Sequence, residues 1–420
     1  MTDLNSLVKI LPIAISLSCA VATSGAFNHR HWMRRSTLDN GTSDQQVVDG
    51  APQHHKFAVK YLKESEPPPN QRLLTCYFSY DQPTLASAIN ASLCTHIMVL
   101  GGFNSVQTDG TLIHADPGQY VKLKAQFRTT NPSVKLLLCV QPDGKNISAV
   151  VRSGAAIIKF AQQTVRFLNT IEYDGFDLDW EFPVFSGQAS DKDGLSKMLR
   201  KFRQLFNANQ RPLLLTAAVS ARPNEIDTSY DVPALNQTLD FINLMMYDFN
   251  YWSATKPITG HNAPLLPGPT DIGPLDHMYT EYSATYWYRK GMQPSRIAVG
   301  IPTYAHTFKL LVPFMHYVHA PAVGFSKYGN EITFSQVCKL LKQNGYEKVW
   351  DDKSRVPYCY KGTTWISYDD VQSVTEKAQW IKTMNFGGAM VYALTTDDVT
   401  GTACAIGPMP LVNTIHRIMM

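Results

Sequence analysis

The stretch that decides the fold of this chain is Tyr173-Asp174-Gly175-Phe176-Asp177-Leu178-Asp179-Trp180-Glu181. From Phe176 to Glu181, apolar and acidic residues alternate strictly. This is the period of a β-strand, whose successive side chains point to opposite faces. Phe176, Leu178 and Trp180 would share one face, and Asp177, Asp179 and Glu181 the other. The sequence therefore predicts a strand with three carboxylates in a row, about 6.6 Å apart.

Three like charges at this spacing cannot all stay ionised away from water, so we expect at least one carboxyl group to keep or share a proton. A carboxylic acid that is protonated near neutral pH can act as a general acid. The spacing leaves two alternatives open. The strand could be a solvated edge strand, although the Phe, Leu and Trp side chains on its other face argue against this. The carboxylates could also bind Ca²⁺ or Mg²⁺.

The composition indicates a globular protein of one large domain or two ordinary ones. The chain has 420 residues, of which 44% are hydrophobic and 17% are charged. The net charge of +4 is small for this length, and no dense run of lysine and arginine is present. We therefore expect no nucleic-acid partner.

The N-terminal segment 1–26 is interpreted as a secretory signal peptide. Its apolar run, residues 10–22, is too short to span a bilayer comfortably and is followed by small residues. The alternative is an uncleaved anchor with the rest of the chain outside the membrane. Arg30, Arg34 and Arg35 argue against the anchor, because they place positive charge on the side that would have to cross. We expect a secreted protein.

Six cysteines follow the signal segment: Cys76, Cys94, Cys139, Cys338, Cys359 and Cys404. None falls in a Cys-x-x-Cys spacing, so a zinc site is not predicted, and we expect no cofactor. Disulfide bonds are the default in an exported protein. Four glycosylation sequons agree with export, at Asn40, Asn90, Asn146 and Asn236.

Residues 27–70 are polar and end in Glu66-Pro67-Pro68-Pro69, which predicts a flexible stem before a folded domain over 71–420. In that domain short apolar runs alternate with amphipathic segments. The expected strands are 73–79, 96–100, 134–140, 175–179, 213–219, 241–247, 297–301 and 388–393. The expected helices are 120–129, 155–170, 195–208, 277–290 and 370–384.

Eight strands that alternate with helices predict an α/β fold, a (β/α)₈ TIM barrel. An open doubly wound sheet competes, but no glycine-rich phosphate loop follows any strand. Residues 309–368, between the seventh and eighth strands, are too long for one helix and predict a small α+β insertion. Glu181 follows the fourth strand, at the end of the barrel where such folds carry their chemistry.

Asp174-Gly175-Phe176-Asp177-Leu178-Asp179-Trp180-Glu181 resembles the Asp-x-x-Asp-x-Asp-x-Glu signature of glycoside hydrolase family 18, the chitinases and chitinase-like lectins. Further segments resemble the family in the same order along the chain, from about Leu73 onward. They are Cys94-Thr95-His96, Asn243-Leu244-Met245-Met246-Tyr247-Asp248, Thr259-Gly260-His261-Asn262-Ala263-Pro264-Leu265, Ile301-Pro302-Thr303-Tyr304 and Gly387-Gly388-Ala389-Met390-Val391.

The resemblance implies hydrolysis of β-1,4-linked N-acetylglucosamine polymers, with retention and with the substrate's own acetamido group as nucleophile. It implies that Glu181 is the general acid, that Asp179 orients the acetamido group and that Asp177 shares a proton with Asp179. The implied substrate-binding residues are Tyr247 and Asp248. Met245, Tyr77, Tyr304 and Tyr392 are further candidates, for each of which packing in the barrel is the alternative.

The resemblance also implies disulfide bonds Cys76–Cys94 and Cys338–Cys404, and leaves Cys139 and Cys359 unassigned. The implied partner is chitin or another N-acetylglucosamine-containing glycan. We expect a monomer, with a membrane contact only through an uncleaved N-terminal anchor.

The departures from the family concern sugar binding. Tyr392 stands where active members usually have Trp, Gln141-Pro142-Asp143 replaces Gly-Gly-Trp, and Asp81 replaces a Trp after the first strand. Val99-Leu100-Gly101 replaces a Tyr-x-Phe. His306 replaces a permanent arginine cation with a titratable residue, which we expect on the rim of the cleft. Each lost ring would weaken sugar binding by about 1–3 kcal/mol. A glycan-binding lectin with little hydrolytic activity is therefore the alternative function.

Overall fold

The computed structural model of the protein describes residues 72–420 except Phe103 and Asn344. The chain divides into two units, 1–51 and 52–420, and all the described residues belong to the second. The signal segment 1–26 and the stem 27–70 lie outside the described residues. Within the described part, no helix is both long enough and apolar enough to cross a membrane.

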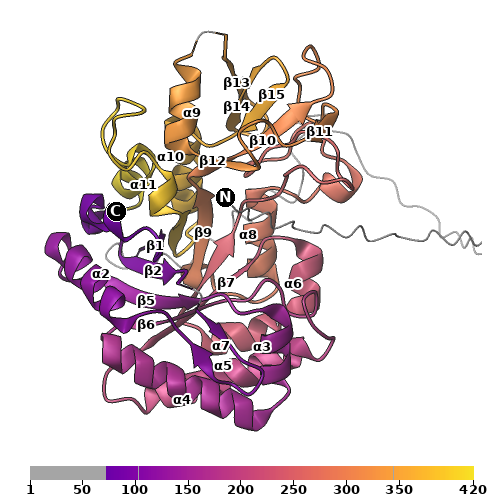
Figure 1. Cartoon of the computed structure of the whole chain (residues 1–420). Helices are drawn as coiled ribbons and strands as arrows, with labels where there is room; N and C mark the ends of the chain where they lie inside the picture. Colours follow the sequence, from indigo (N-terminus) through magenta and orange to yellow (C-terminus); the bar gives the residue numbers. More distant parts are fainter. Residues whose placement is uncertain (1–71, 103, 344) are drawn as a thin grey trace, which may run out of the picture. The chain divides into compact units, whose positions relative to one another are not determined.

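Eight parallel strands close into a barrel (Figure 1), in the order β1-β16-β9-β8-β7-β6-β5-β2. Their bounds are β1 Leu73–Ser79, β2 His96–Leu100, β5 Lys135–Val140, β6 Gly175–Asp179, β7 Leu214–Ser220, β8 Phe241–Met245, β9 Ile297–Pro302 and β16 Gly388–Tyr392. The predicted TIM barrel is confirmed, and each predicted strand lies within two residues of an observed one. The open doubly wound sheet is excluded, because β1 pairs with both β2 and β16.

Helices follow most of the strands and cover the outside of the barrel (Figure 1). Their bounds are α2 Pro117–Thr130, α3 Gly144–Val151, α4 Gly154–Ile171, α5 Asp191–Asn207, α6 Pro223–Ser229, α7 Val232–Thr238, α8 Thr280–Arg289, α10 Val371–Thr383 and α11 Pro410–Met419. Short 3₁₀ turns occur at η1 Pro83–Ala88, η2 Ala91–Leu93, η3 Gly273–Leu275, η4 Pro294–Arg296 and η5 Leu394–Thr396. Between β1 and β2 the chain makes only η1 and η2 in place of a helix.

The long connection after β9 forms the predicted α+β insertion. Its sheet contains β10 Tyr304–Leu310, β11 Ala322–Gly324, β12 Glu331–Thr333, β13 Glu347–Asp351, β14 Val356–Lys361 and β15 Thr364–Ser367, with α9 Phe334–Leu341 between β12 and β13. Thr333 and Gln336 form a capping box that starts α9. Because β10 begins two residues after β9 ends, the insertion rises from the carboxyl end of the barrel strands. A separate hairpin, β3 Ser105–Val106 with β4 Leu112–Ile113, follows β2.

The core has two parts, one between the barrel strands and the helices and one inside the barrel, and β6 contributes side chains to both. Phe176 and Leu178 face the helices, and the Phe176 ring lies 5.0 Å from that of Phe202 on α5. The other face of β6 points into the barrel, where tyrosine, methionine and alanine side chains from the other strands fill the space. Gly175 starts the strand because a Cβ atom there would lie 2.4 Å from the carbonyl oxygen of Leu214.

Candidate active site

The carboxylates of β6 lie inside the barrel, as the alternation predicted. Asp177 and Asp179 are 0% and 3% exposed, and Glu181 follows two residues beyond, at the mouth. The solvated edge strand is excluded because β6 pairs with β5 on one side and β7 on the other. Among the described residues, no group of three or more potential ligands is arranged to hold a metal ion.

Asp177 is held at the bottom of the site by hydrogen bonds from three other strands. The Tyr77 hydroxyl donates to its Oδ2 at 2.7 Å, and the Thr216 hydroxyl and the Asn243 amide donate to its Oδ1 at 2.5 and 3.2 Å. The Thr75 hydroxyl donates in turn to the Asn243 carbonyl oxygen at 2.7 Å. Burial raises the pKa of Asp177, although these donors act in the opposite direction.

Asp179 and Glu181 share one donor, the side-chain amide of Gln141. Its Nε2 atom lies 3.2 Å from Asp179 Oδ2 and 2.8 Å from Glu181 Oε1. The other oxygen of Asp179, Oδ1, is buried and has no hydrogen-bond partner among the described residues. A buried carboxylate oxygen without a partner can accept a hydrogen bond from a ligand that enters the barrel mouth.

The pKa values of both carboxyl groups of this pair are raised. Burial, together with the negative charge of Glu181, raises the pKa of Asp179 well above its usual range. Burial also raises the pKa of Glu181, against the hydrogen bond from Gln141, which lowers it. The Glu181 side chain is open to solvent, but the mouth of the barrel surrounds it with protein on the other sides. Both shifts have the direction that retention of a proton by these clustered acids requires.

Four tyrosines surround the carboxylates. The Tyr392 ring lies 5.5 Å from the rings of Tyr77 and Tyr247 and 6.0 Å from that of Tyr304. Tyr77 and Tyr392 border a cleft, and Tyr77, Tyr247 and Tyr304 are buried, at 1%, 8% and 5% exposure. Met245 packs at the edge of the same cluster. The structure therefore brings together all the tyrosines that the sequence analysis proposed for the site.

Asp248 follows β8 and is fixed from three sides. His306 and Tyr304, on β10, both bond its Oδ1, and the side-chain Oδ1 of Asn262 accepts from its backbone N–H at 2.8 Å. Asp248 has φ 57°, a conformation that Asp tolerates better than most residues. The expectation that His306 lies on the rim is wrong: its side chain is buried, because β10 turns inward over the barrel and pairs with β12 and β15.

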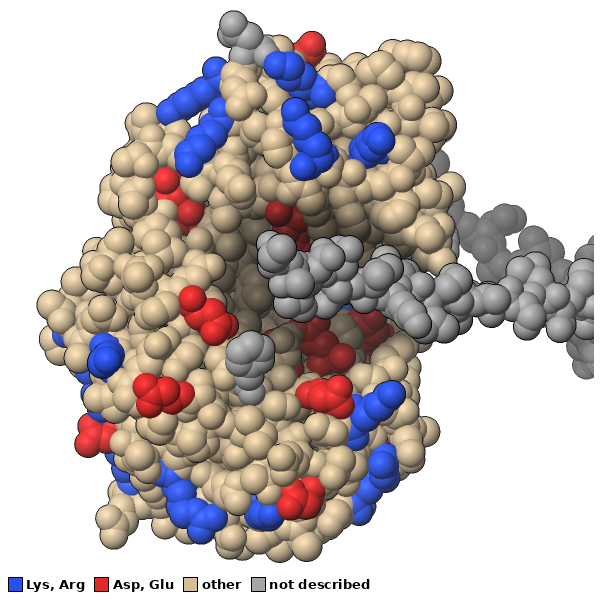
Figure 2. Space-filling model, viewed as in Figure 1, with Lys and Arg blue, Asp and Glu red and all other residues tan. Residues whose placement is uncertain are grey.

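A cleft of about 680 Å³ opens above these residues. In Figure 2 the visible part of this face is hollowed, with acidic side chains inside the hollow and lysine and arginine side chains around it. The cleft lining includes Tyr77, Asp81, Gln141, Glu331 and Tyr392. Asp81 and Glu331 are the charged residues among those that line it, and no lysine or arginine is among them.

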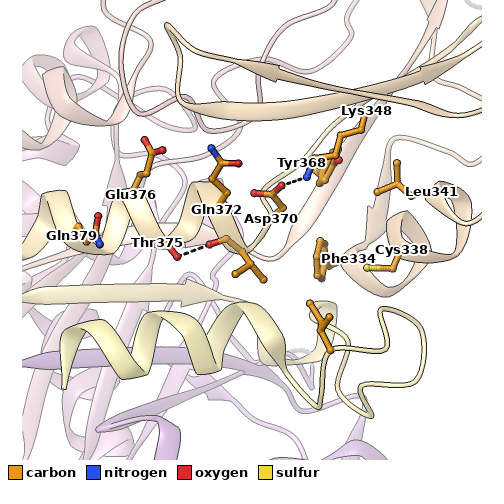
Figure 3. A pocket seen from close by; sticks show the side chains of 12 residues that line it. Phe334, Cys338, Leu341, Lys348, Tyr368, Asp370, Gln372, Thr375, Glu376 and Gln379 are labelled. Carbon is orange, nitrogen blue, oxygen red and sulfur yellow. Dashed lines mark hydrogen bonds and ion pairs between the residues drawn. The ribbon is translucent and has the colours of Figure 1, made fainter.

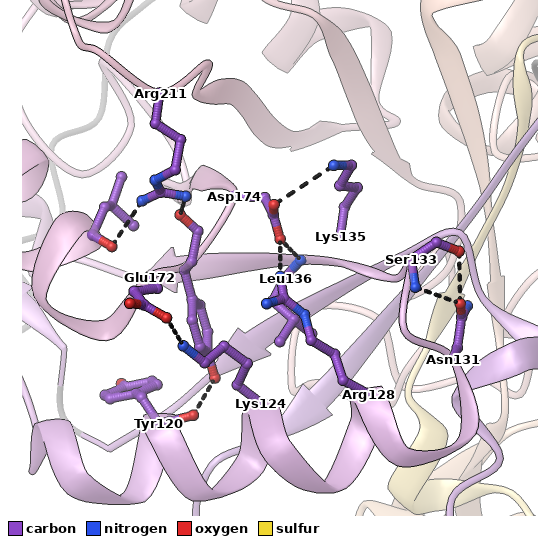
Figure 4. A network of polar contacts seen from close by, with 12 residues as sticks. Tyr120, Lys124, Arg128, Asn131, Ser133, Lys135, Leu136, Glu172, Asp174 and Arg211 are labelled. Carbon is purple, nitrogen blue, oxygen red and sulfur yellow. Dashed lines mark hydrogen bonds and ion pairs between the residues drawn. The ribbon is translucent and has the colours of Figure 1, made fainter.

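Asp174, the first acid of the signature, lies at the opposite end of β6 (Figure 4). Its Oδ2 accepts from the backbone N–H of Leu136 at 2.9 Å and from Arg128 at 3.1 Å, and its Oδ1 lies 3.6 Å from Lys135. These contacts tie β6 to β5 and α2. Asp174 therefore supports the turn before the strand.

Comparisons with known proteins agree with this geometry. The family model described as "Glycosyl hydrolases family 18" matches residues 73–397. The chain belongs to glycoside hydrolase family 18. It is 34% identical over 364 residues to Chitinase-3-like protein 2 of Homo sapiens, an alignment that covers 82% of this chain and 92% of the relative.

Two solved structures of family 18 proteins show how the fold is used elsewhere. The immunomodulatory active chitinase TsES1 from Trichuris suis has a TM-score of 0.76 and 32% identity, with 83% of this chain and 100% of that chain covered. Human YKL-39, a pseudo-chitinase with retained chitooligosaccharide binding, has a TM-score of 0.75 and 32% identity, with 83% and 99% covered. The chain is thus a chitinase-like protein, and its structural relatives of 32% identity include a chitinase and a pseudo-chitinase.

The family 18 resemblance also implied the disulfide bonds. Cys76–Cys94 and Cys338–Cys404 are both formed. Cys139 and Cys359 are free and buried. Cys139 lies in the barrel next to Asp177, and burial raises the pKa of its thiol well above the usual range.

Sequence reasoning missed several residues of this family 18 site. Thr75, Thr216 and Asn243 hold Asp177, directly or through one another, and Gln141 holds the other two acids. Thr75, Thr216 and Asn243 had a usable signal, because each is a polar residue inside a run that otherwise reads as a buried strand. Gln141 stood out only as a departure from the family pattern, because its contacts depend on where β5 ends relative to β6.

A second hollow of about 650 Å³ lies away from the carboxylates, between α9, α10 and Ile406 (Figure 3). Its lining is mostly apolar and includes Phe334, Leu341 and Val371, with the Lys348–Asp370 ion pair at one side. It contains no residue that the sequence analysis proposed for the site.

Proposed function

We propose that this family 18 protein hydrolyses β-1,4-linked N-acetylglucosamine polymers or oligomers, with Glu181 as the general acid. The observation that carries the proposal is the pair Asp179–Glu181, two neighbouring carboxyl groups whose pKa values are both raised, at the mouth of a barrel beside an open cleft. General acid catalysis needs a proton that is still bound near the working pH.

The proposed reaction uses the substrate's acetamido group. Glu181 donates its proton to the glycosidic oxygen, the bond from that oxygen to the anomeric carbon breaks, and the acetamido carbonyl oxygen bonds to the anomeric carbon. The positive charge then lies on the oxazolinium ring, whose N–H donates to Asp179. Glu181, now ionised, removes a proton from water as the water attacks the same carbon, which opens the ring and gives net retention. Family 18 is a recognised exception to the two-carboxylate scheme.

Asp177 and the neighbouring side chains would support this reaction. Asp177 would share a proton with Asp179, because the two lie on the same face of β6 and burial raises the pKa of Asp177. The unpartnered Oδ1 of Asp179 is a natural acceptor for the acetamido N–H. Tyr247, Asp248 and Met245 would contact the sugar at the point of cleavage, and Tyr77, Tyr304 and Tyr392 would form its apolar floor.

The proposal is tested with Glu181→Gln, which keeps the side-chain shape and removes the transferable proton. We expect release of sugar from a fluorogenic N-acetylglucosamine oligomer to fall by about 10²–10⁴-fold, with binding retained. Glu172→Gln is the matched control, because Glu172 is 71% exposed and lies before β6, at the other end of the barrel. Equal rates for the wild type and Glu181→Gln would refute the proposal.

A glycan-binding lectin is the second candidate, favoured by the cleft wall. Asp81 and Gly101 stand in the lining where many family 18 members carry aromatic rings, so the cleft offers fewer stacking faces to a sugar chain. Calorimetry with a chito-oligomer that shows binding, with no product over days, would favour this function. The two disulfide bonds support an oxidising, extracytosolic location for either function.

A further inference from the structure

Gln141 stands where the sequence departs from the Gly-Gly-Trp of the family resemblance. It is the first residue after β5, and its side chain is exposed to the cleft that Tyr77 and Tyr392 also line. Its amide nitrogen lies within hydrogen-bonding distance of both Asp179 and Glu181. A glycine at this position would leave both carboxylates without this donor.

The two contacts use both hydrogens of one amide group. Carboxylate oxygens accept hydrogen bonds, so the group that faces them has to be the NH₂ end of Gln141. The pair of bonds holds Asp179 Oδ2 and Glu181 Oε1 on the same side of the barrel mouth, at 3.2 and 2.8 Å from one atom. Gln141 thereby gives Asp179 an amide N–H donor, the same chemical group that an acetamido substituent would bring.

We propose that Gln141 is a positioning residue that clasps Glu181 to Asp179 in the free protein, and that a glycan has to break this clasp before Glu181 can reach a glycosidic oxygen. This inference rests on the proposed function, because it concerns the regulation of the same site. Part of the binding free energy of the glycan is used to break the hydrogen bonds of Gln141, so the clasp weakens glycan binding and slows turnover.

The clasp also biases the protonation of Glu181. A hydrogen bond from a neutral donor favours the ionised form of a carboxyl group. Gln141 lowers the pKa of Glu181, against burial and the charge of Asp248, which raise it. Loss of the donor therefore raises the pKa of Glu181, so the carboxyl group stays protonated to a higher pH.

Other titratable and charged groups face Glu181 from the elements around it, and of these Asp179 also loses a hydrogen bond when Gln141 is replaced. They are Asp177 and Asp179 on β6, Cys139 on β5, Asp248 and Tyr247 after β8, Tyr392 on β16, and Glu225 and Tyr230 at α6, with Arg222 beside Glu225.

Two substitutions separate the two effects of the side chain. Gln141→Leu removes the donor but keeps comparable bulk in the cleft, whereas Gln141→Gly removes both. The basic limb of the pH profile of kcat/KM reports the general acid in the free enzyme. We expect this limb to move to higher pH in both variants. We expect KM to fall about tenfold in Gln141→Gly only, because the hydrogen bonds from Gln141 no longer have to be broken and the space is open.

The same variants test the clasp by binding, without catalysis. In the Glu181→Gln background, Gln141→Gly should bind a chito-tetraose about as tightly as, or more tightly than, the parent, and Gln141→Leu more weakly. In the Glu181-containing protein, Gln141→Gly should bind about tenfold tighter than wild type. Thermal unfolding of each variant at the assay pH verifies that the protein is folded.

The outcomes distinguish a failure of the clasp from a failure of the proposed function. A basic limb that stays in place in both variants, or a Gln141→Gly protein that binds the oligomer no tighter than wild type, overturns the clasp and leaves the proposed function standing. A wild-type protein that neither binds nor cleaves any N-acetylglucosamine oligomer refutes the proposed function itself, and with it the clasp. A shifted limb with tighter binding in Gln141→Gly supports both.

Discussion

The Nε2 atom of His306 lies 2.7 Å from Oδ1 of Asp248, and the hydroxyl of Tyr304 donates to the same oxygen. His306 is 1% exposed, and its Nδ1 lies 3.2 Å from the side-chain oxygen of Asn330. The ion pair thus joins the loop after β8 to the insertion. Burial acts to raise the pKa of Asp248, but the hydrogen bond and charge of His306 outweigh it, so the net shift is downward.

Replacement of His306 by Ala should destabilise the fold in a pH-dependent way. A carboxyl group whose pKa is lowered by folding contributes stability above its unfolded pKa of about 3.9, and this contribution is lost as the pH falls through the folded value. We expect a loss of about 1–3 kcal/mol at pH 7, and a smaller loss near pH 3, measured by urea unfolding.

His306→Gln is the comparison for this experiment, because it keeps a donor for Asp248 and removes the titratable charge. It should retain part of the stability that His306→Ala loses. A destabilisation by His306→Ala of the same size at pH 7 and pH 3 would show that only packing, and no charge pairing, is involved.

Replacement of Asp179 by Asn should stabilise the protein at neutral pH. Folding raises the pKa of Asp179, so the folded state binds its proton more tightly, and the wild type loses stability as the pH rises above the unfolded value of about 3.9. The loss amounts to about 1.4 kcal/mol for each pH unit over which only the unfolded carboxyl group is ionised. Asn avoids this loss, while the proposed catalysis declines.

Urea unfolding of the Asp179→Asn variant between pH 4 and pH 8 measures this effect. The stability gain should grow with pH until the folded carboxyl group ionises. Asp193→Asn is the control, because Asp193 is 67% exposed and pairs with Lys197 on the surface of α5. A variant that is less stable than wild type across the whole range would contradict a buried, proton-retaining Asp179.

Replacement of Tyr392 by Ala should weaken glycan binding. The Tyr392 ring lines the cleft and rests 5.5 Å from the rings of Tyr77 and Tyr247, so its removal takes away a stacking face and its support. Stacking on an aromatic ring contributes about 1–3 kcal/mol for a flat ligand, which corresponds to a roughly 5–150-fold weaker Kd. Calorimetry in the Glu181→Gln background measures this without turnover.

Tyr392→Phe separates the ring from the hydroxyl group. Because it keeps the aromatic face, its Kd should remain within about threefold of that of the parent. If Tyr392→Ala binds a chito-oligomer as well as the parent does, Tyr392 is part of the barrel packing only, which was the alternative reading of this residue.

Loss of the Cys338–Cys404 bond should destabilise the protein more than loss of Cys76–Cys94. The two bonds close loops with sequence separations of 66 and 18 residues. The chain-entropy account gives about 4 kcal/mol for the longer loop and about 3 kcal/mol for the shorter one. Denaturation of the two paired Cys→Ser variants tests the order, and a larger loss from the shorter loop would contradict it.

The barrel strands were predictable because each is a short, mostly apolar run between turn signals. Outside the insertion, four short or terminal helices were not predicted: α3, α6, α7 and α11. A helix of seven or eight residues, such as α3, α6 or α7, shows only two turns of apolar period, which is too little for a pattern to stand out. The residues that cap these helices can be recognised only in the structure. In α3, the Asp143 side chain accepts from the backbone N–H groups of Lys145 and Asn146.

The sequence by itself determined which residues share a face of β6, because the direction of successive side chains follows from the local backbone of a strand. It also showed, through the signature, which acids belong together. Only the tertiary structure decided what those acids touch. Tyr77 reaches Asp177 across 100 residues of sequence, Gln141 reaches Glu181 across 40, and His306 is buried against Asp248. Such contacts depend on the register and closure of the barrel, which bring the ends of distant strands together and which no local pattern encodes.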